Sequence, residues 1–182
     1  DGYSADERGV VSAPKDGMVH GEIRHPVTAI NELRAFPFPD PLKGRRWAGV
    51  AEAVAAITEH WSVACLGPTL WERMHFICGM ENAMIWLHEH PEDMTLFADR
   101  IVDYHLAEIE RFGAMGLNCI WHQDDWGTQQ GLTISPEMWR VFFKPRYARL
   151  FVRCHELGMA NFMHSCGNIL EIIPDLAEIG LD

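Results

Sequence analysis

The stretch Leu117-Asn118-Cys119-Ile120-Trp121-His122-Gln123, which runs into Asp124-Asp125-Trp126-Gly127, decides the fold. A short apolar run that gives way to a polar loop with glycine, and then to a helical pattern, is typical of a buried strand in a parallel sheet. The same order of patterns occurs upstream at Trp61–Leu66 and downstream at Ala160–His164. Strands that alternate with helices predict an α/β fold with crossover helices.

Helical segments fill the intervals between these strands. Their predicted ranges are 70–78, 81–89, 91–112 and 136–157. Pro145 removes a backbone donor, so we expect the last helix to kink near Lys144. Three to four such units do not close an eight-stranded barrel, which predicts part of a (β/α)8 barrel truncated at its C-terminus. An open doubly wound sheet is the alternative, but no glycine-rich phosphate loop follows the first strand.

Residues 1–46 follow a different pattern and are predicted to form an N-terminal arm. Asp16-Gly17 lies between two apolar runs and predicts a hairpin turn. Three prolines in the segment 35–41 exclude a helix there and indicate an extended linker. We therefore expect an arm, hairpin and linker over 1–46 and the barrel part over 47–182.

Composition excludes several classes of partner. A formal charge of -11 and a pI near 5.3 argue against nucleic acid and anionic membranes. No apolar run approaches the roughly 20 residues that span a bilayer, and no signal peptide opens the chain. The five cysteines are odd in number and irregular in spacing, which predicts a reducing compartment, the cytoplasm, rather than a disulfide framework.

The candidate catalytic and metal-binding residues lie where the predicted strands end. This is the edge that carries the active site in α/β barrels. His164 and Cys166 are two residues apart, so they point to the same side of an extended strand. Imidazole nitrogen and thiolate sulfur are zinc ligands, but a catalytic site needs a third. From the spacing alone, a packed cysteine and a hydrogen-bonded histidine remain the alternative.

Asp124 and Asp125 are the candidate catalytic carboxylates. Adjacent residues of an extended loop face opposite ways, so at most one is expected to point into the barrel mouth, where it would orient substrate, act as a base or support a metal-binding histidine. A turn into Gly127 is the structural alternative. The residues expected to bind substrate around them are His122, Trp126, Gln129 and Cys65. His122 also fits an ordinary core histidine.

Several motifs together resemble a known superfamily. They are Asp124-Asp125-Trp126-Gly127-Thr128-Gln129, Ile134-Ser135-Pro136-Glu137-Met138-Trp139, Phe143-Lys144-Pro145-Arg146-Tyr147, His164-Ser165-Cys166-Gly167-Asn168 and Ile179-Gly180-Leu181-Asp182. In order and spacing, over about 61–182, the chain resembles the uroporphyrinogen decarboxylase (URO-D) superfamily. That superfamily includes cobalamin-dependent methyltransferases, and its fold is a (β/α)8 barrel with the site at the C-terminal ends of the strands.

The resemblance is closer to the methyltransferase branch. That branch carries His-x-Cys as two zinc ligands, which His164 and Cys166 match, and a third cysteine that would lie beyond Asp182. The implied activity is zinc-dependent methyl transfer between a corrinoid and a thiol, in either direction, with the corrinoid delivered by a carrier protein. The decarboxylases instead usually carry a Phe-x-x-Gly type segment there and use no metal or cofactor.

Two alternatives remain at this point. In a uroporphyrinogen decarboxylase, Asp124 or Asp125 would bind the pyrrole N–H groups and stabilise the cation formed on protonation of a ring carbon. The double aspartate departs from the aromatic-glycine loop that decarboxylases carry there. The second alternative is a non-catalytic barrel that binds a corrinoid or another small ligand.

Overall fold

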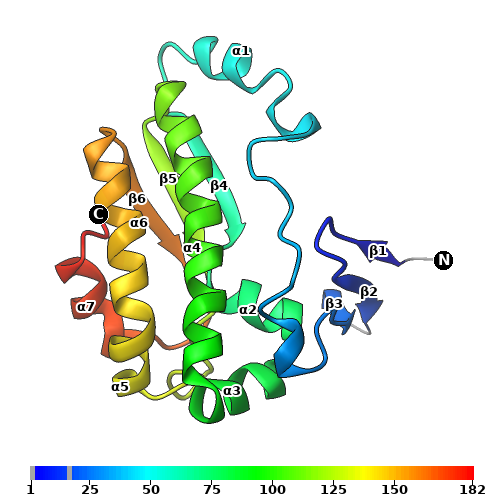
Figure 1. Cartoon of the computed structure of the whole chain (residues 1–182). Helices are drawn as coiled ribbons and strands as arrows, with labels where there is room; N and C mark the ends of the chain where they lie inside the picture. Colours follow the sequence, from blue (N-terminus) through cyan, green and yellow to red (C-terminus); the bar gives the residue numbers. More distant parts are fainter. Residues whose placement is uncertain (1–2, 16–17) are drawn as a thin grey trace. The chain divides into compact units, whose positions relative to one another are not determined.

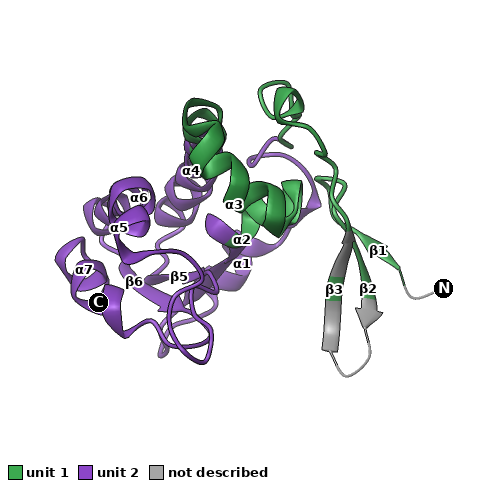
Figure 2. Cartoon of the chain, turned by 90° about the horizontal axis from the view of Figure 1, so that it is seen from below, with its two compact units in different colours: residues 1–39, 72–98 green, residues 40–71, 99–182 purple. Residues whose placement is uncertain are grey.

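The computed structural model describes residues 3–15 and 18–182, and the chain divides into two units (Figure 1, Figure 2). Unit 1 comprises residues 1–39 and 72–98, and unit 2 comprises residues 40–71 and 99–182. All three predicted parallel strands fall in unit 2. The division at residue 46 expected from the sequence stays a prediction.

Unit 1 contains the N-terminal antiparallel sheet. Its strands, in spatial order, are β1 (Ser4–Ala5), β2 (Val11–Lys15) and β3 (Met18–Arg24). The pairing of β2 with β3 runs from Val11 opposite Arg24 to Lys15 opposite Met18. The predicted hairpin is therefore confirmed, while its turn residues, Asp16-Gly17, lie outside the described residues.

The other regular elements of unit 1 are helices. After a 3₁₀ turn at Ile30–Glu32 come α2 (Trp71–Cys78), α3 (Met80–Glu89) and α4 (Pro91–Ala114), whose last 16 residues, from 99 to 114, belong to unit 2. Phe36 packs edge-on against Phe97 of α4, with ring centroids 6.4 Å apart. Residues 36–40 lie outside any helix or strand, as the prolines of this segment require, and the linker itself stays a prediction.

Unit 2 is built on a parallel sheet in the order β4 (Val63–Pro68), β5 (Cys119–Gln123) and β6 (Ala160–His164). A 3₁₀ turn at Arg45–Trp47 and α1 (Val50–Ala55) precede β4. A 3₁₀ turn at Leu170–Ile172 and α7 (Ile173–Glu178) follow β6. The predicted α/β class and parallel sheet are confirmed.

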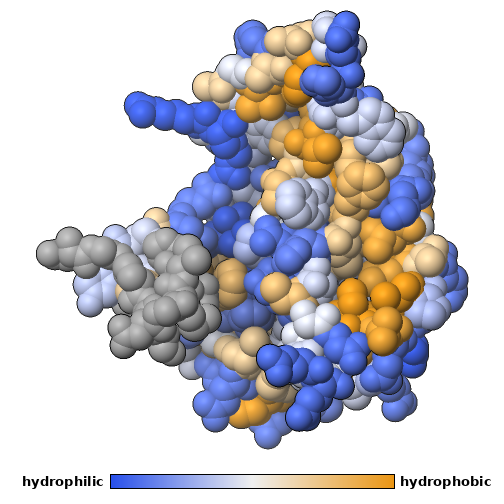
Figure 3. All heavy atoms as spheres, turned by 180° about the vertical axis from the view of Figure 1, so that it is seen from behind, coloured by the Kyte–Doolittle hydropathy of each residue, from blue (hydrophilic) through white to orange (hydrophobic). Residues whose placement is uncertain are grey.

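The two faces of this sheet differ, because successive side chains of a strand point to opposite sides. In Figure 1, α4 and α6 lie on one side of the strands. On that side His122 and Asn161 are fully buried, and the ring of Phe151 from α6 lies 4.9 Å from that of His122. The opposite face carries Trp121 and Phe162, which are 44% and 43% exposed. Figure 3 views the molecule from behind and shows apolar groups on this open side.

The helix that follows β5 is not a single α-helix. It consists of α5 (Pro136–Met138), a π turn (Trp139–Phe143) and α6 (Lys144–Glu156). Pro145 has no N–H to donate to the preceding turn, and the chain widens into π geometry directly before it. The predicted break near Lys144 therefore takes the form of a π turn.

Ser135 caps α5, because its side chain accepts a hydrogen bond from the Met138 N–H. Within residues 3–15 and 18–182, none of the helices combines the length and the apolar character needed to cross a bilayer.

Candidate metal centre

The loops that follow β5 and β6 continue the pairing of these strands. The Asp124 N–H donates to the His164 carbonyl at 3.1 Å, and the Gly127 N–H donates to the Cys166 carbonyl at 3.0 Å. The Asn168 N–H then donates to the Thr128 carbonyl at 2.7 Å. The two predicted site loops are thus held side by side along their backbones.

Two glycines permit this close approach. A Cβ atom on Gly167 would lie 2.3 Å from the backbone of Gly127, and a Cβ on Gly127 would lie 2.5 Å from the Asn168 nitrogen. Gly167 also has a φ of +79°, in the left-handed region that L side chains rarely adopt. A side chain at either position would push the loops apart.

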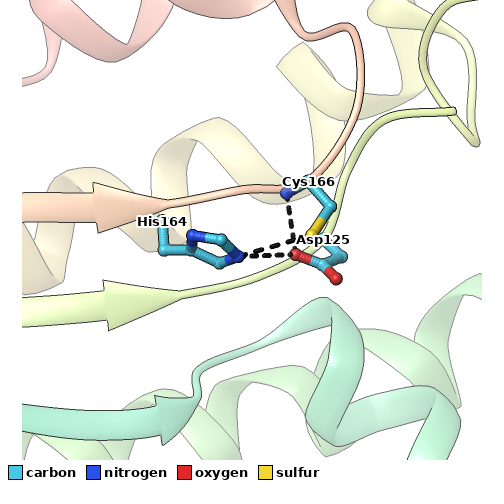
Figure 4. A group of neighbouring side chains, drawn as sticks. All are labelled: Asp125, His164 and Cys166. Carbon is cyan, nitrogen blue, oxygen red and sulfur yellow. Dashed lines mark hydrogen bonds and ion pairs between the residues drawn. The ribbon is translucent and has the colours of Figure 1, made fainter. Parts of the chain in front are cut away.

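Between these loops, Asp125, His164 and Cys166 form a cluster (Figure 4). The Cys166 Sγ lies 3.4 Å from the His164 Nε2, and the Asp125 Oδ1 lies 3.4 Å from the same nitrogen. The Asp125 Oδ1 also accepts a hydrogen bond of 2.8 Å from the Cys166 backbone N–H. One donor atom from each of the three residues lies within 4.8 Å of the others.

The donor set and its spacing fit a zinc ion. Zinc binds imidazole nitrogen, thiolate sulfur and carboxylate oxygen at roughly 2.0–2.3 Å in tetrahedral geometry, which places neighbouring donor atoms about 3.4–3.6 Å apart. The nitrogen–sulfur and nitrogen–oxygen separations of 3.4 Å agree with this spacing. A thiolate and a carboxylate would also balance the two charges of the ion.

The other cysteines differ from Cys166 in their surroundings. Burial raises the pKa of the Cys78 and Cys154 thiols to about 12, and it also raises the pKa of Cys119. Such thiols stay protonated at neutral pH and are poor metal ligands. Cys65 is exposed, as Cys166 is, but Cys65 lies on β4 and is not a member of the cluster.

The comparisons with known proteins bear on this arrangement. A family model described as uroporphyrinogen decarboxylase (URO-D) matches residues 10–182. The chain belongs to the URO-D family. A solved methyltransferase from Methanosarcina mazei matches this URO-D chain with a TM-score of 0.73 at 18% identity, covering 96% of this chain and 51% of that one. The chain therefore spans about half the length of that methyltransferase. No curated protein matches it.

These findings confirm the family that the motifs resemble and the fold class. The parallel sheet with its helices is part of the URO-D barrel fold, preceded by an antiparallel hairpin. At 18% identity the likeness to the methyltransferase shows the fold alone. The roles of individual residues in this URO-D chain depend on its own geometry.

The two adjacent aspartates face opposite ways, as expected of an extended segment. Asp125 is half-buried in the cluster, whereas Asp124 is fully buried. The Asp124 Oδ2 accepts hydrogen bonds from the backbone N–H groups of Leu70 and Trp71, at 2.7 and 3.0 Å, and from the Tyr147 hydroxyl. These contacts favour a structural role that ties the start of α2 to the β5 loop. A catalytic role for Asp124 stays a prediction.

His122 occupies a core position in the URO-D sheet. Its Nε2 lies 3.0 Å from the Asn161 Oδ1, and no side chain or backbone group of the described residues is bonded to its Nδ1. Burial lowers the pKa of His122 to about 4, so the imidazole is neutral at physiological pH. This position favours packing, and the substrate contact expected from the sequence stays a prediction.

The remaining residues expected to bind substrate are dispersed. Trp126 is fully buried among aromatic rings, including Trp139 and Phe143 at 6.2 and 4.6 Å, so it supports the loop from the core side. Gln129 is exposed on the loop after Gly127, and Cys65 is exposed on β4. Their contribution to substrate binding stays a prediction.

Sequence reasoning did not single out Gln123 or Ser165. The Ser165 Oγ accepts a hydrogen bond of 2.9 Å from the Trp126 N–H and thereby adds to the contacts between the two loops. Gln123 pairs with His164 across β5 and β6. Strand periodicity would have identified Gln123, because it lies two residues before Asp125 and so shares its side of the chain.

Proposed function

We propose that the protein is a zinc-dependent methyltransferase of the URO-D family, which transfers a methyl group between a corrinoid and a thiol, in either direction. The observation that carries this proposal is the convergence of Asp125, His164 and Cys166. URO-D membership and the fold shared with a methyltransferase are consistent with it.

His164 and Cys166 would hold the ion, and Asp125 would supply the third donor from within this chain. The resemblance also implies a cysteine ligand beyond Asp182. Zinc binds both carboxylate oxygen and thiolate sulfur, so Asp125 and that cysteine are compatible as ligands of one ion. Bound zinc supplies a Lewis acid that keeps a thiol ionised at neutral pH. The corrinoid would arrive on a separate carrier protein.

The chain's own residues would prepare the site before any ligand binds. Asp125 accepts the Cys166 N–H and faces the His164 ring, so it orients both other members of the cluster. The Trp121 ring lies 6.5 Å from the His164 ring at 72° and so restricts the position of the imidazole. Side chains held in this way lose little entropy when a ligand binds.

A reducing, cytoplasmic location is part of the same proposal. All five cysteines are free thiols, and a site with a thiolate ligand requires its cysteine to stay reduced.

The test is the zinc content of the intact protein, purified without chelator, in the wild type and in Cys166→Ser, His164→Ala and Asp125→Asn. We expect about one zinc per chain in the wild type and its loss in the Cys166 and His164 variants. Asp125→Asn should weaken zinc binding by at least about 10–100-fold, the effect of losing an orienting partner. Cys65→Ser is the matched control, because it removes an exposed thiol outside the cluster and should keep the zinc.

The outcome also separates the two enzymatic alternatives. A folded wild type without zinc would refute the proposal, and conversion of uroporphyrinogen to coproporphyrinogen would be assayed next. In that reaction Asp125, the aspartate that faces the open side, would bind the pyrrole N–H groups.

A further inference from the structure

Gln123 ends β5 next to His164, a member of the Asp125–His164–Cys166 cluster. The parallel register pairs Gln123 with His164 on β6. Paired residues of adjacent parallel strands project to the same face, with their strands about 4.8 Å apart. The Gln123 carboxamide therefore shares the open face of the sheet with a proposed zinc ligand.

The backbone of Gln123 is fixed from the β4 side. The Gln123 N–H donates to the Thr69 Oγ1 at 3.0 Å, and the Gln123 carbonyl accepts from the Thr69 N–H at 2.8 Å. Two hydrogen bonds to one residue determine the direction in which the Gln123 side chain leaves the strand. The side chain is half-buried and does not depend on a mobile loop for its position.

The Cys65 thiol contacts the oxygen end of the Gln123 amide. The Gly67 N–H donates to the Cys65 Sγ at 3.3 Å, so the sulfur acts as an acceptor there. Its single S–H then points to the Gln123 Oε1 at 3.7 Å. In this contact the oxygen end of the amide faces Cys65, and the Nε2 group, with two N–H donors, faces away from it.

We propose that Gln123 is a substrate-binding residue of the metal centre. It donates an N–H to an oxygen acceptor on the thiol bound there, such as a hydroxyl or carbonyl oxygen a few bonds from the sulfur. Cys65 is a positioning residue that orients the Gln123 amide. The inference rests on the proposed function, because it requires a thiol at the Asp125–His164–Cys166 cluster.

The test measures thiol binding rather than turnover. The intact protein is loaded with Co²⁺ in place of zinc, and the thiolate-to-cobalt charge-transfer band is followed while 2-mercaptoethanol or 1-propanethiol is added. These probes are uncharged and similar in size, and they differ by a hydroxyl in place of a methyl group. The ratio of their Kd values, compared between wild type and Gln123→Met, cancels their intrinsic difference in metal affinity.

We expect Gln123→Met to reduce the preference for 2-mercaptoethanol by about three- to tenfold, the typical net effect of one neutral hydrogen bond. Gln123→Asn, which withdraws the amide by one methylene, should lose the preference in the same way. Gln130→Met on the exposed loop is the matched control and should keep the wild-type ratio. Cys65→Ala should weaken the preference, and Cys65→Ser, which retains a donor, should restore it.

The two proposals fail in different ways. Co²⁺-loaded Gln123→Met and Gln123→Asn with the wild-type ratio would overturn the role of Gln123 and leave the metal site intact. A folded wild type that takes up neither Co²⁺ nor zinc would refute the metal centre, and with it this inference.

Discussion

Substitution of Gly167 by alanine tests how the site loops are held together. The new Cβ would lie 2.3 Å from the Gly127 carbonyl carbon and oxygen, well inside any real contact distance. The backbone of Gly167, with its φ of +79°, would also be strained by any side chain. The atoms that the new Cβ would meet belong to the backbone of Gly127, so no side-chain rotation can relieve the contact.

The expected loss of stability follows from two contributions. An L-residue in the left-handed region costs about 1–2 kcal/mol. Separation of the loops removes two backbone hydrogen bonds, Gly127 N–H to the Cys166 carbonyl and Asn168 N–H to the Thr128 carbonyl, which contribute about 0.5–1.5 kcal/mol each. The reduced freedom of alanine in the unfolded chain offsets about 0.4–1 kcal/mol. The net loss is about 1–5 kcal/mol.

Three matched variants separate strain from contact. Gly127→Ala brings a Cβ into close contact at a residue whose φ is not positive. Gly158→Ala places a Cβ at a residue whose φ is +77° but which has no neighbour within 4 Å of that Cβ. Gly131→Ala creates no close contact, and the φ of Gly131 is not positive. We expect losses of about 0–3 kcal/mol for Gly127→Ala, about 1 kcal/mol for Gly158→Ala, and none for Gly131→Ala.

The assay combines urea denaturation of the intact protein with zinc affinity. Gly167→Ala and Gly127→Ala should weaken zinc binding by about 10–100-fold, because the loops orient the ligands. Gly158→Ala should lose stability and keep its zinc affinity. If Gly167→Ala matched Gly131→Ala in both measurements, the argument that close backbone contact holds the cluster together would be wrong.

Three further predictions concern buried side chains. Asp124→Ala should lower the free energy of unfolding by about 3–6 kcal/mol, because two backbone N–H groups and the Tyr147 hydroxyl lose a buried acceptor; a loss below about 1 kcal/mol in urea denaturation would contradict this. His122 has a pKa of about 4 when folded against an ordinary value of 6.5, so the unfolded state binds more protons between these pH values. The stability that depends on neutral His122, roughly 3 kcal/mol, is present above pH 6.5 and is lost as the pH falls towards 4. Denaturation from pH 4 to 7 should show a shallower pH dependence in His122→Gln than in wild type, and equal slopes would refute the assignment. Trp126→Leu should destabilise the fold by about 3 kcal/mol through the cavity it leaves; unchanged stability with lost thiol binding would instead favour the substrate contact expected from the sequence.

Local patterns were sufficient to predict the parallel strands of unit 2 and the helical segments that became α2, α3, α4 and α5 to α6. Apolar runs bounded by glycine and polar loops predicted β5 and β6, because buried parallel strands require apolar residues on both faces. The period of two also placed His164 and Cys166 on one side of the chain, and their side chains lie 3.4 Å apart. The π turn before Pro145 could not be predicted in detail, because proline only excludes a regular helix and does not select what replaces it.

The sequence by itself thus determined the order of strands and helices, the edge of the sheet where the candidate metal centre lies, and the pair His164 and Cys166. All of these follow from backbone periodicities and turn chemistry within a few residues. Only the tertiary structure decided that Asp125, 39 positions before His164, joins the pair and that Asp124 turns into the core. The physical reason is that the partners of a side chain across a parallel sheet depend on register and on how closely two backbones approach. These are non-local quantities, set here by the pairing of β5 with β6 and by the contact of Gly127 with Gly167.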